Sequence, residues 1–263
     1  MSVIKINMSK KIQTAERVSQ SDVSDNYVYQ RSVLAYVEAA KRIHGKVLEI
    51  GTGSGYGVEM LSEKAESFLT IDKFASQVGT DLSEKLENVE FKQMNVPPLT
   101  GLPDNHFDFV VSFQVIEHIK KDGDFVKEIH RVLKKGGKFI VTTPNRKMSL
   151  TRNPWHIREY TVDELTTLLK SSFSAVEANG VFGNDVVMEY YEINKKSVQR
   201  IMRFDIFNLQ YNLPRQILQV PYDIMNRRNR KKLSDSGSHI KMEDYFVATA
   251  KDDCIDLFYI AEK

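Results

Sequence analysis

Four glycines crowd into VLEIGTGSGYG, residues 47–57, directly after a short apolar run. Glycine costs conformational entropy in regular structure, so the cluster indicates a tight turn or a backbone that a ligand approaches closely. Asp72 ends the next apolar run, 21 residues after Gly51. A carboxylate at that place can accept hydrogen bonds from both hydroxyls of a ribose. Together the two features predict a site for an adenosine-containing ligand.

The spacing of the glycines bears on which ligand that is. The dinucleotide-binding fingerprint has a glycine at its sixth position, where this chain has Tyr56. A bulky side chain there opposes the close helix packing and free amides that a pyrophosphate needs. The spacing favours a ligand without a pyrophosphate, and an NAD-dependent oxidoreductase remains the alternative.

VLEIGTGSGYG resembles the first motif of the class I S-adenosylmethionine-dependent methyltransferases. FLTID, LPDNHFDFVVSFQVIEHI and EIHRVLKKGGKFIVTTPN are similar to later segments of that family, in the same order, over about residues 45–145. NPWHIREYTVDELTTLL resembles the next element of many small-molecule members, such as the ubiquinone and menaquinone biosynthesis type. The resemblance implies S-adenosyl-L-methionine as cofactor and S-adenosyl-L-homocysteine as its product.

The first motif and the ribose acid carry five of the cofactor-binding residues that the resemblance implies. Gly51, Gly53 and Gly55 let the backbone meet the methionine portion and the ribose. Glu49 orders this loop and interacts with the amino acid end of the cofactor, directly or through water. Asp72 binds the ribose hydroxyls.

Four further cofactor-binding positions follow from the resemblance. Asn95 stands where the family usually has an aspartate that accepts from the adenine amine, and Val96 lies along the ring edge. Lys73 occupies the place of an apolar residue that packs on the adenine, a contact that Phe74 can take over. Gln114 lies past the fourth strand and faces the methyl group.

Two histidines are the candidate catalytic residues. Methyl transfer from a sulfonium is an in-line displacement, so alignment and exclusion of water matter most, and a base helps chiefly when the acceptor is a hydroxyl. His118 and His156 follow the fourth and fifth predicted strands, where ligands of such sheets bind. The competing interpretation is that each histidine packs or caps without touching the acceptor.

Several acceptors are not expected. Members that methylate amino groups of bases resemble one another in an Asn/Asp-Pro-Pro-aromatic tetrad, but this chain has Ser112-Phe-Gln-Val115 there. Carbon-5 methylation of pyrimidines needs a cysteine nucleophile, and Cys254 lies in the wrong place. No carboxylate cluster of the magnesium-binding type is visible, so no metal is expected. The predicted acceptor is an oxygen or nitrogen of a small molecule, and nucleic acid is not expected as a partner.

The elements that position these residues alternate between strands and helices. Apolar runs predict strands at 47–50, 68–71, 89–92, 109–112, 139–143, 175–182 and 255–261. Helical spacing predicts a helix within 25–43, one from Asp122 that Gly136–Gly137 ends, and one opened by a capping box at Thr161. The expected fold class is α/β, with a Rossmann-like, mostly parallel sheet of seven strands. Its last strand is antiparallel, helices cover both faces, and a helical or looped insertion is added.

Four segments organise the chain in this interpretation. Residues 1–24 form a flexible N-terminal arm, 25–183 the S-adenosylmethionine-binding core, 184–235 an insertion covering the acceptor site, and 236–263 the C-terminal strands that complete the core. The basic run NRRNRKK at 226–232 is expected as a solvated loop. A cofactor-binding scaffold that binds RNA through this run, without catalysis, is a further alternative.

Composition sets outer limits. The chain has 263 residues, a net charge of +2 and one cysteine, which excludes an intrachain disulfide and a cysteine-based zinc cluster. No apolar run approaches the roughly 18 residues of a membrane span, and the first residues do not form a signal peptide. We therefore expect a cytoplasmic protein without a transmembrane segment.

Overall fold

The computed structural model describes residues 16, 18–74 and 77–263. Within them, eight strands form one sheet in the order β3-β2-β1-β4-β5-β8-β6-β7. The strands are β1 Lys46–Ile50, β2 Ser67–Asp72, β3 Val89–Gln93, β4 Phe107–Phe113, β5 Leu133–Pro144, β6 Ala175–Gly183, β7 Tyr245–Thr249 and β8 Asp256–Glu262. Neighbours among the first five strands pair in parallel, so their carboxyl ends share one edge of the sheet.

The antiparallel strands lie at the other side of the sheet. β8 pairs antiparallel with both β5 and β6, as predicted for the last strand. β7 adds an eighth strand, antiparallel to β6 at the sheet edge. Its short run YFVAT buries Tyr245 but leaves Phe246 half exposed, so it carries no strong apolar pattern. The Rossmann-like α/β fold class is confirmed, with one strand more than expected.

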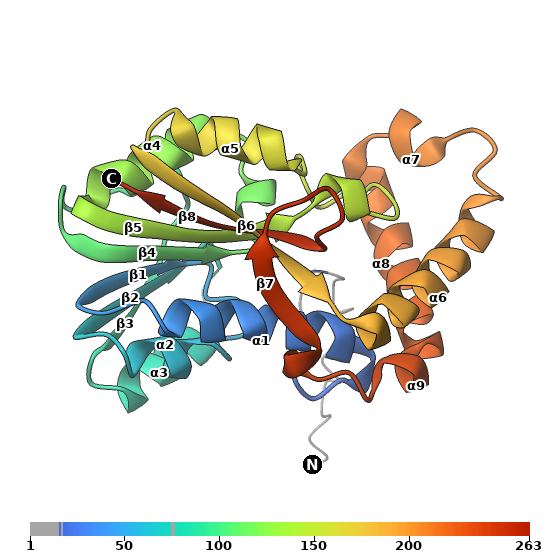
Figure 1. Cartoon of the computed structure of the whole chain (residues 1–263), viewed down its shortest axis with the longest axis horizontal. Helices are drawn as coiled ribbons and strands as arrows, with labels where there is room; N and C mark the ends of the chain where they lie inside the picture. The colour runs from blue at the N-terminus through green and yellow to red at the C-terminus, as the bar shows by residue number, and fades with distance from the viewer. Residues whose placement is uncertain (1–15, 17, 75–76) are drawn as a thin grey trace, which may run out of the picture.

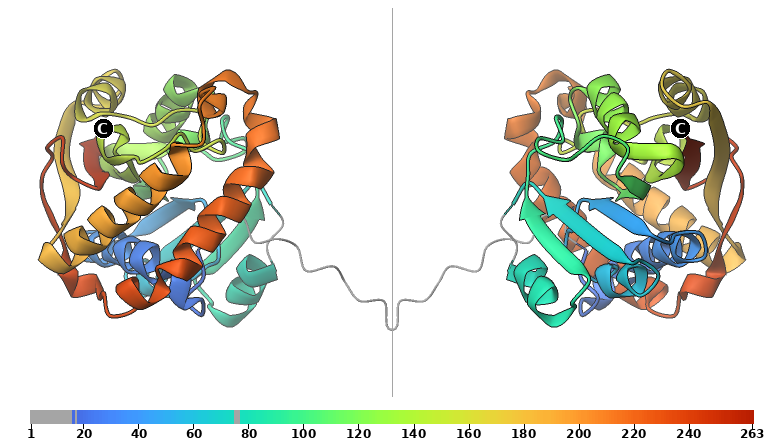
Figure 2. Two further views of the ribbon diagram at one scale, coloured as in Figure 1. Left: turned by 90° about the vertical axis from the view of Figure 1, so that its right-hand side faces the viewer. Right: turned by 90° about the vertical axis from the view of Figure 1, so that its left-hand side faces the viewer.

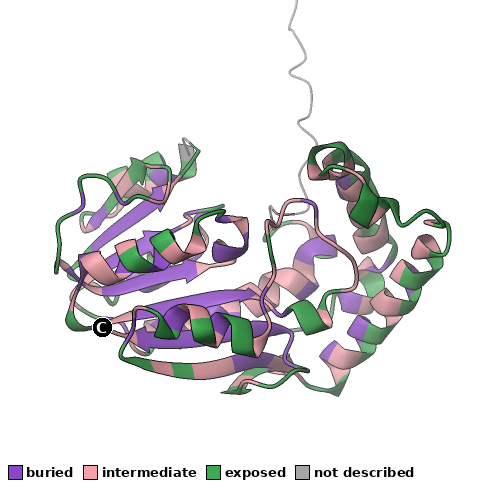
Figure 3. Cartoon of the chain, turned by 90° about the horizontal axis from the view of Figure 1, so that it is seen from above, coloured by how far each residue is buried: buried purple, intermediate pink, exposed green. Residues whose placement is uncertain are grey.

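Helices cover both faces of the sheet (Figure 1). α1 Asn26–Ala40, α2 Val58–Ser62 and α3 Gln77–Lys85 lie on one face, and α4 Asp122–Val132 and α5 Val162–Lys170 on the other. Each face has its own buried apolar cluster, and the strands between them are largely buried (Figure 3). Short 3-10 turns are η1 Val23–Asp25, η2 Ile116–His118, η3 Arg146–Met148 and η4 Met242–Asp244.

The predicted end of the helix that starts at Asp122 was wrong. α4 ends at Val132, and Gly136 and Gly137 lie inside β5. Their backbone pairs with that of Lys263. The N–H of Gly136 donates to the Lys263 carbonyl, and the N–H of Lys263 donates to the Gly137 carbonyl. A Cβ on Gly137 would come within 2.9 Å of a backbone oxygen of Lys134. Gly137 therefore permits a close backbone approach in the sheet, and Gly136 a φ of 76°, and neither glycine caps a helix.

The segment 184–235 is largely helical. Four helices, α6 Asp185–Met202, α7 Leu209–Asn212, α8 Arg215–Lys232 and α9 Ser234–Gly237, stand together beside one end of the sheet (Figures 1 and 2). Asn184 is the N-cap of α6, and its side chain accepts hydrogen bonds from two backbone N–H groups of the first turn. Among the described residues, no helix combines the length and apolar character needed to span a membrane.

The basic run 226–232 is not the solvated loop that we expected. It forms the last turns of α8. Two of its arginines, Arg227 and Arg230, lie 2.5 and 2.9 Å from Oδ1 of Asp25, a fully buried carboxylate just before α1. These ion pairs tie α8 to α1, so part of the run serves packing within the chain.

Candidate functional site

The glycine loop joins β1 to α2 at the carboxyl edge of the parallel strands. Gly51, Gly53 and Gly55 have φ angles of 100°, 55° and 76°, in the region that favours glycine. A Cβ on Gly51 would come within 2.5 Å of Val115, and one on Gly55 within 2.6 Å of Val78. Among the residues that the structure describes, nothing lies within 4 Å of a Cβ built on Gly53, so this part of the chain leaves open space beside it.

Asp72 closes the loop from the end of β2. Its carboxylate accepts hydrogen bonds from the backbone N–H groups of Gly53, at 3.1 Å, and Phe74, at 2.9 Å. Gly51 N–H also donates to the Ile71 carbonyl at 2.8 Å, which binds the start of the loop to β2. Open space over Gly53 next to a carboxylate fits a ribose-bearing ligand, because its hydroxyls need a nearby acceptor.

Glu49 lies beneath the loop and is buried. It accepts hydrogen bonds from the hydroxyls of Tyr36, at 3.0 Å, and Thr70, at 2.6 Å. Burial raises the pKa of Glu49 to about 7, although the two hydrogen bonds lower it, and the Asp72 charge adds a smaller increase. The side chain thus joins α1, β1 and β2, and its role in ordering the loop stays a prediction.

The remaining predicted cofactor positions follow β2 and β3 at the same edge. Lys73 is exposed, with its Nζ 4.8 Å from the centroid of the Phe74 ring. Asn95 is exposed, and Val96 is half buried against the core. Met94 N–H donates to the Asp72 carbonyl at 2.8 Å, which brings this segment beside the ribose acid. Their contacts with the cofactor stay predictions.

Gln114 follows β4 in a left-handed backbone conformation, with φ of 56°. Such a conformation is costly for a residue with a side chain and is often found at functional sites. Its Nε2 lies 3.3 Å from Oδ2 of Asp256, which also pairs with Nε of Arg31 at 2.8 Å. Oδ1 of Asp256 is buried and has no hydrogen-bond partner among the described residues.

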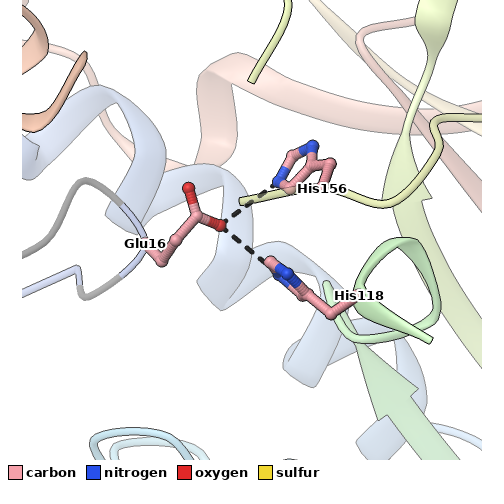
Figure 4. Close-up of side chains that lie close together, drawn as sticks. All are labelled: Glu16, His118 and His156. Atoms are coloured by element: carbon pink, nitrogen blue, oxygen red, sulfur yellow. Dashed lines mark hydrogen bonds and ion pairs between the residues drawn. The ribbon is translucent and has the colours of Figure 1, made fainter. Parts of the chain in front are cut away.

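The structure brings His118 and His156 together with Glu16 (Figure 4). Oε2 of Glu16 lies 3.4 Å from Nε2 of His118 and 3.2 Å from Nε2 of His156, and we call these three residues the Glu16–histidine cluster. Glu16 did not emerge from the sequence, because its segment has no apolar period or motif. Its segment also reaches the glycine loop, where the Ser54 hydroxyl donates to the Val18 carbonyl at 3.3 Å.

Charge and burial work against each other in the cluster. Burial disfavours a charge on His156, but hydrogen bonds to Glu159 and Glu16 outweigh it and raise the pKa of His156 to about 10. Burial likewise lowers the pKa of His118, but the hydrogen bond with Glu16 raises it, and the pKa lies above its ordinary value. Burial would raise the pKa of Glu16, yet its hydrogen bonds with both histidines hold that pKa far below the usual range. The Glu16 carboxylate and a positive charge on the histidines therefore stabilise each other in the cluster.

A cavity of about 530 Å³ lies beside this cluster, between the sheet and the helices of 184–235. Its lining reaches His156 and Glu159 at the loop after β5, and Arg31 and Asp256 near the sheet. Apolar walls come from α6 and α8, through Val198, Ile201, Met202, Leu218, Pro221 and Met225. Buried Oδ1 of Asn226, another lining residue, also has no hydrogen-bond partner among the described residues. The cavity thus combines an apolar body with polar groups that a ligand could satisfy.

The parallel sheet, the glycine loop and the acid after β2 define a Rossmann-like protein with a site for an adenosine-containing ligand. Comparison with known proteins specifies the family. Residues 48–141 match the family model described as a methyltransferase domain. A protein of Mycolicibacterium smegmatis, named as a probable S-adenosylmethionine-dependent methyltransferase, is 30% identical over 259 residues, which cover 94% of this chain and 93% of the relative.

Two further similarities agree. A probable S-adenosylmethionine-dependent methyltransferase of Mycobacterium tuberculosis is 38% identical over 176 residues, or 64% of each chain. The solved structure of a SAM-dependent methyltransferase from Thermotoga maritima has the same fold, with a TM-score of 0.54 at 17% identity over 90% of this chain and 91% of that one.

The chain belongs to the class I S-adenosylmethionine-dependent methyltransferases, as its motifs indicated. It is an enzyme, and S-adenosyl-L-methionine is its cofactor. The NAD-dependent alternative and the non-catalytic scaffold are not favoured by these comparisons.

Proposed function

We propose that the enzyme transfers the methyl group to an oxygen or nitrogen atom of a small molecule bound in the cavity beneath α6 and α8. The observation that carries the proposal is the cavity itself, because it connects an apolar chamber to the predicted catalytic residue His156. S-adenosyl-L-methionine supplies an activated methyl group on a sulfonium sulfur. The chain has to align the acceptor with that group and exclude water.

The cofactor-binding set in this proposal is the predicted one. Glu49 orders the glycine loop from below, through its hydrogen bonds to α1 and β2. The backbone around Gly53 receives the ligand in open space, beside the Asp72 carboxylate that would bind the ribose hydroxyls. Lys73, Asn95 and Val96 would lie along the adenine. Gln114 would lie at the methyl group, supported by the contact of its Nε2 with Asp256.

The shape of the cavity indicates an acceptor with an apolar body and a hydroxyl or amino group. Aliphatic side chains of α6 and α8 would pack against the body. The unpartnered oxygens of Asp256 and Asn226 would accept hydrogen bonds from polar groups of the acceptor. This division of apolar and polar contacts is typical of small-molecule sites.

His118 and His156 would bind the acceptor atom and take up its proton. Methylation of a hydroxyl forms an ether and releases one proton, which a nearby imidazole can accept. Each ring can do so only in its neutral form, so the charge balance of the Glu16–histidine cluster decides whether it acts as a base.

The proposal assigns roles to the four predicted segments. Residues 25–183 bind the cofactor, 184–235 cover the acceptor, and 236–263 complete the sheet through β7 and β8. The arm at 1–24 lies mostly outside the described residues. Its described part reaches the site through Glu16 and Val18.

A two-variant experiment tests the function. Purified enzyme is supplied with radiolabelled methyl donor and pools of hydroxyl- and amine-bearing small molecules. Ile201→Trp fills the cavity and should abolish transfer while S-adenosylhomocysteine affinity, measured by calorimetry, is unchanged. Phe207→Trp is the matched control, because Phe207 is exposed and does not line the cavity. Transfer to no small molecule, or equal transfer by both variants, would refute the proposal.

Asp72→Asn tests the cofactor side. The variant keeps an oxygen for the Gly53 amide but loses the charge that strengthens hydrogen bonds from the ribose. We expect S-adenosylhomocysteine affinity to fall roughly 10-fold or more, since a hydrogen bond to a charged group contributes about 1.5–3 kcal/mol. Unchanged affinity in the calorimeter would exclude Asp72 from ribose binding.

A further inference from the structure

The Glu16–histidine cluster brings three metal-ligating side chains to one point (Figure 4). The candidate ligand atoms of Glu16, His118 and His156 all lie within 4.8 Å of one another. Atoms bound to one transition-metal ion at about 2.0–2.2 Å lie this close together. The spacing therefore suits one shared cation without a change of backbone.

The outward-facing nitrogen of His118 already has the partner that a metal ligand needs. Its Nδ1 lies 3.1 Å from the backbone carbonyl of Trp155. A carbonyl only accepts hydrogen bonds, so Nδ1 carries the proton. In the neutral ring, Nε2 then holds a lone pair that faces Glu16.

His156 repeats this arrangement with a carboxylate. Its Nδ1 lies 2.7 Å from Oε1 of Glu159 and donates to it. Metal-ligating histidines almost always donate their other ring nitrogen to a carboxylate, carbonyl or water, which orients the ring and makes it more basic. Both histidines thus have the supporting contacts of a built metal site.

The electron pairs at the centre of the cluster need a positive charge. When both rings are neutral, two Nε2 lone pairs and the Glu16 carboxylate face one another, and a proton on a ring or a shared cation stabilises this arrangement. Asn153 bears on the choice, because its Nδ2 lies 2.9 Å from Nε2 of His156 and 2.8 Å from Oε1 of Glu16. Its Oδ1 accepts from Trp155 N–H, so the amide nitrogen is the atom that faces His156. A hydrogen bond donated to Nε2 uses its single lone pair, so a cation bound there would replace this contact, while Asn153 would keep its hydrogen bond to Glu16.

We propose that Glu16, His118 and His156 bind one divalent transition-metal cation at the edge of the acceptor cavity. Two imidazole nitrogens and one carboxylate oxygen suit Zn²⁺, Fe²⁺ or Co²⁺, whereas Mg²⁺ and Ca²⁺ prefer oxygen ligands. This departs from the expectation of no metal drawn from the sequence, because Glu16 lies in a segment without a readable pattern.

Three protein ligands leave positions open on the cation. His156 and its partner Glu159 line the cavity, so one ligand of the cation borders the proposed acceptor site. Resting here on the proposed function, we infer that an acceptor hydroxyl binds the cation and releases its proton to water more readily, as metal-bound water does. In this arrangement His118 and His156 act as ligands of the cation and not as bases. Glu16 lies near Val18, which contacts the glycine loop, so the cation would connect this described part of the chain to the residues after β4 and β5.

The test uses the full chain, stripped of metal by a chelator and titrated with Co²⁺. We expect one Co²⁺ per chain by calorimetry, with visible absorption bands that report nitrogen ligands. Glu16→Gln and His118→Ala should abolish this binding. Glu159→Gln should weaken it by about 10–100-fold, as loss of a supporting contact does. His239→Ala, at an exposed histidine outside the site, is the matched control and should bind normally.

S-adenosylhomocysteine affinity of each variant shows whether it is folded. Absence of saturable Co²⁺ binding, or equal binding by the wild type and Glu16→Gln, would overturn the cation site. Methyl transfer is measured separately, with and without Zn²⁺. A chain that binds Co²⁺ but methylates no small molecule refutes the proposed function alone, and one that methylates without binding any cation refutes this inference alone.

Discussion

At the scale of single residues, Gly53 and Gly55 lie two positions apart in one loop and are glycine for different reasons. Both have positive φ angles. Val78 and Leu82 close the space for a side chain at Gly55, whereas no described residue closes it at Gly53. The first constraint concerns packing, and the second concerns a ligand that approaches the backbone.

Alanine at each position separates these constraints. Gly55→Ala should lower the melting temperature clearly, because the new methyl group clashes with two apolar side chains and the backbone is strained. Gly53→Ala should cost only about 1–2 kcal/mol of backbone strain but should weaken S-adenosylhomocysteine binding. Thermal unfolding and calorimetry check both variants. The same loss of affinity without any difference in stability would contradict the distinction.

At the scale of elements, Glu49 joins three of them beneath the glycine loop. Tyr36 of α1 and Thr70 of β2 donate to its carboxyl group, which stands on β1. The motif VLEIG predicted a strand and a turn, and both formed. It could not predict a raised pKa, because that depends on burial under α1, a contact between separate elements.

The raised pKa of Glu49 makes stability depend on pH. Between its ordinary value of 4.5 and about 7, the unfolded chain has lost this proton while the folded chain keeps it. The folded state therefore binds more protons, and the contribution to stability, full below pH 4.5, is lost as pH rises through 7. We expect a decrease of at most about 3 kcal/mol. Denaturant unfolding at several pH values should show it, and Glu49→Gln should flatten the curve; an equally steep curve for the variant would assign the effect elsewhere.

Local patterns predicted elements well where local contacts decide them. The capping box at Thr161 is present, with Glu164 completing it, because both partners lie within one helical turn. The predicted end of α4 was wrong because Gly136 and Gly137 pair with Lys263, which is distant in the sequence. A local rule has no access to that partner.

At the scale of the whole molecule, two buried ion pairs hold α8 against η1, at the start of α1. Asp25 is fully buried, and the side chains of Arg227 and Arg230 are only 11% and 16% exposed. Loss of the carboxylate would leave two desolvated positive charges close together. The position of α8, and with it one wall of the proposed acceptor cavity, depends on this contact.

Asp25→Asn should destabilise the protein by about 3 kcal/mol, the cost of breaking a buried pair. It should also reduce methyl transfer more than cofactor affinity, because α8 lines the proposed acceptor cavity and not the glycine loop. Asp104→Asn is the control, since Asp104 is an exposed partner of Arg131 and its loss should cost under about 1 kcal/mol. Equal destabilisation by the two variants, measured in denaturant, would show that the Asp25 contact does not anchor α8.

The sequence by itself determined the parallel sheet, the glycine loop and the position of Asp72 at the end of the second strand, and these features identified the methyltransferase family. They could be predicted because they depend on residues close together in the chain and on strand order. Tertiary structure alone decided that Glu16 meets His118 and His156, that the basic run anchors α8, and that a cavity opens beside the cluster. The physical reason is that side chains from distant segments contact one another, and become buried together, only after the chain has folded around the sheet.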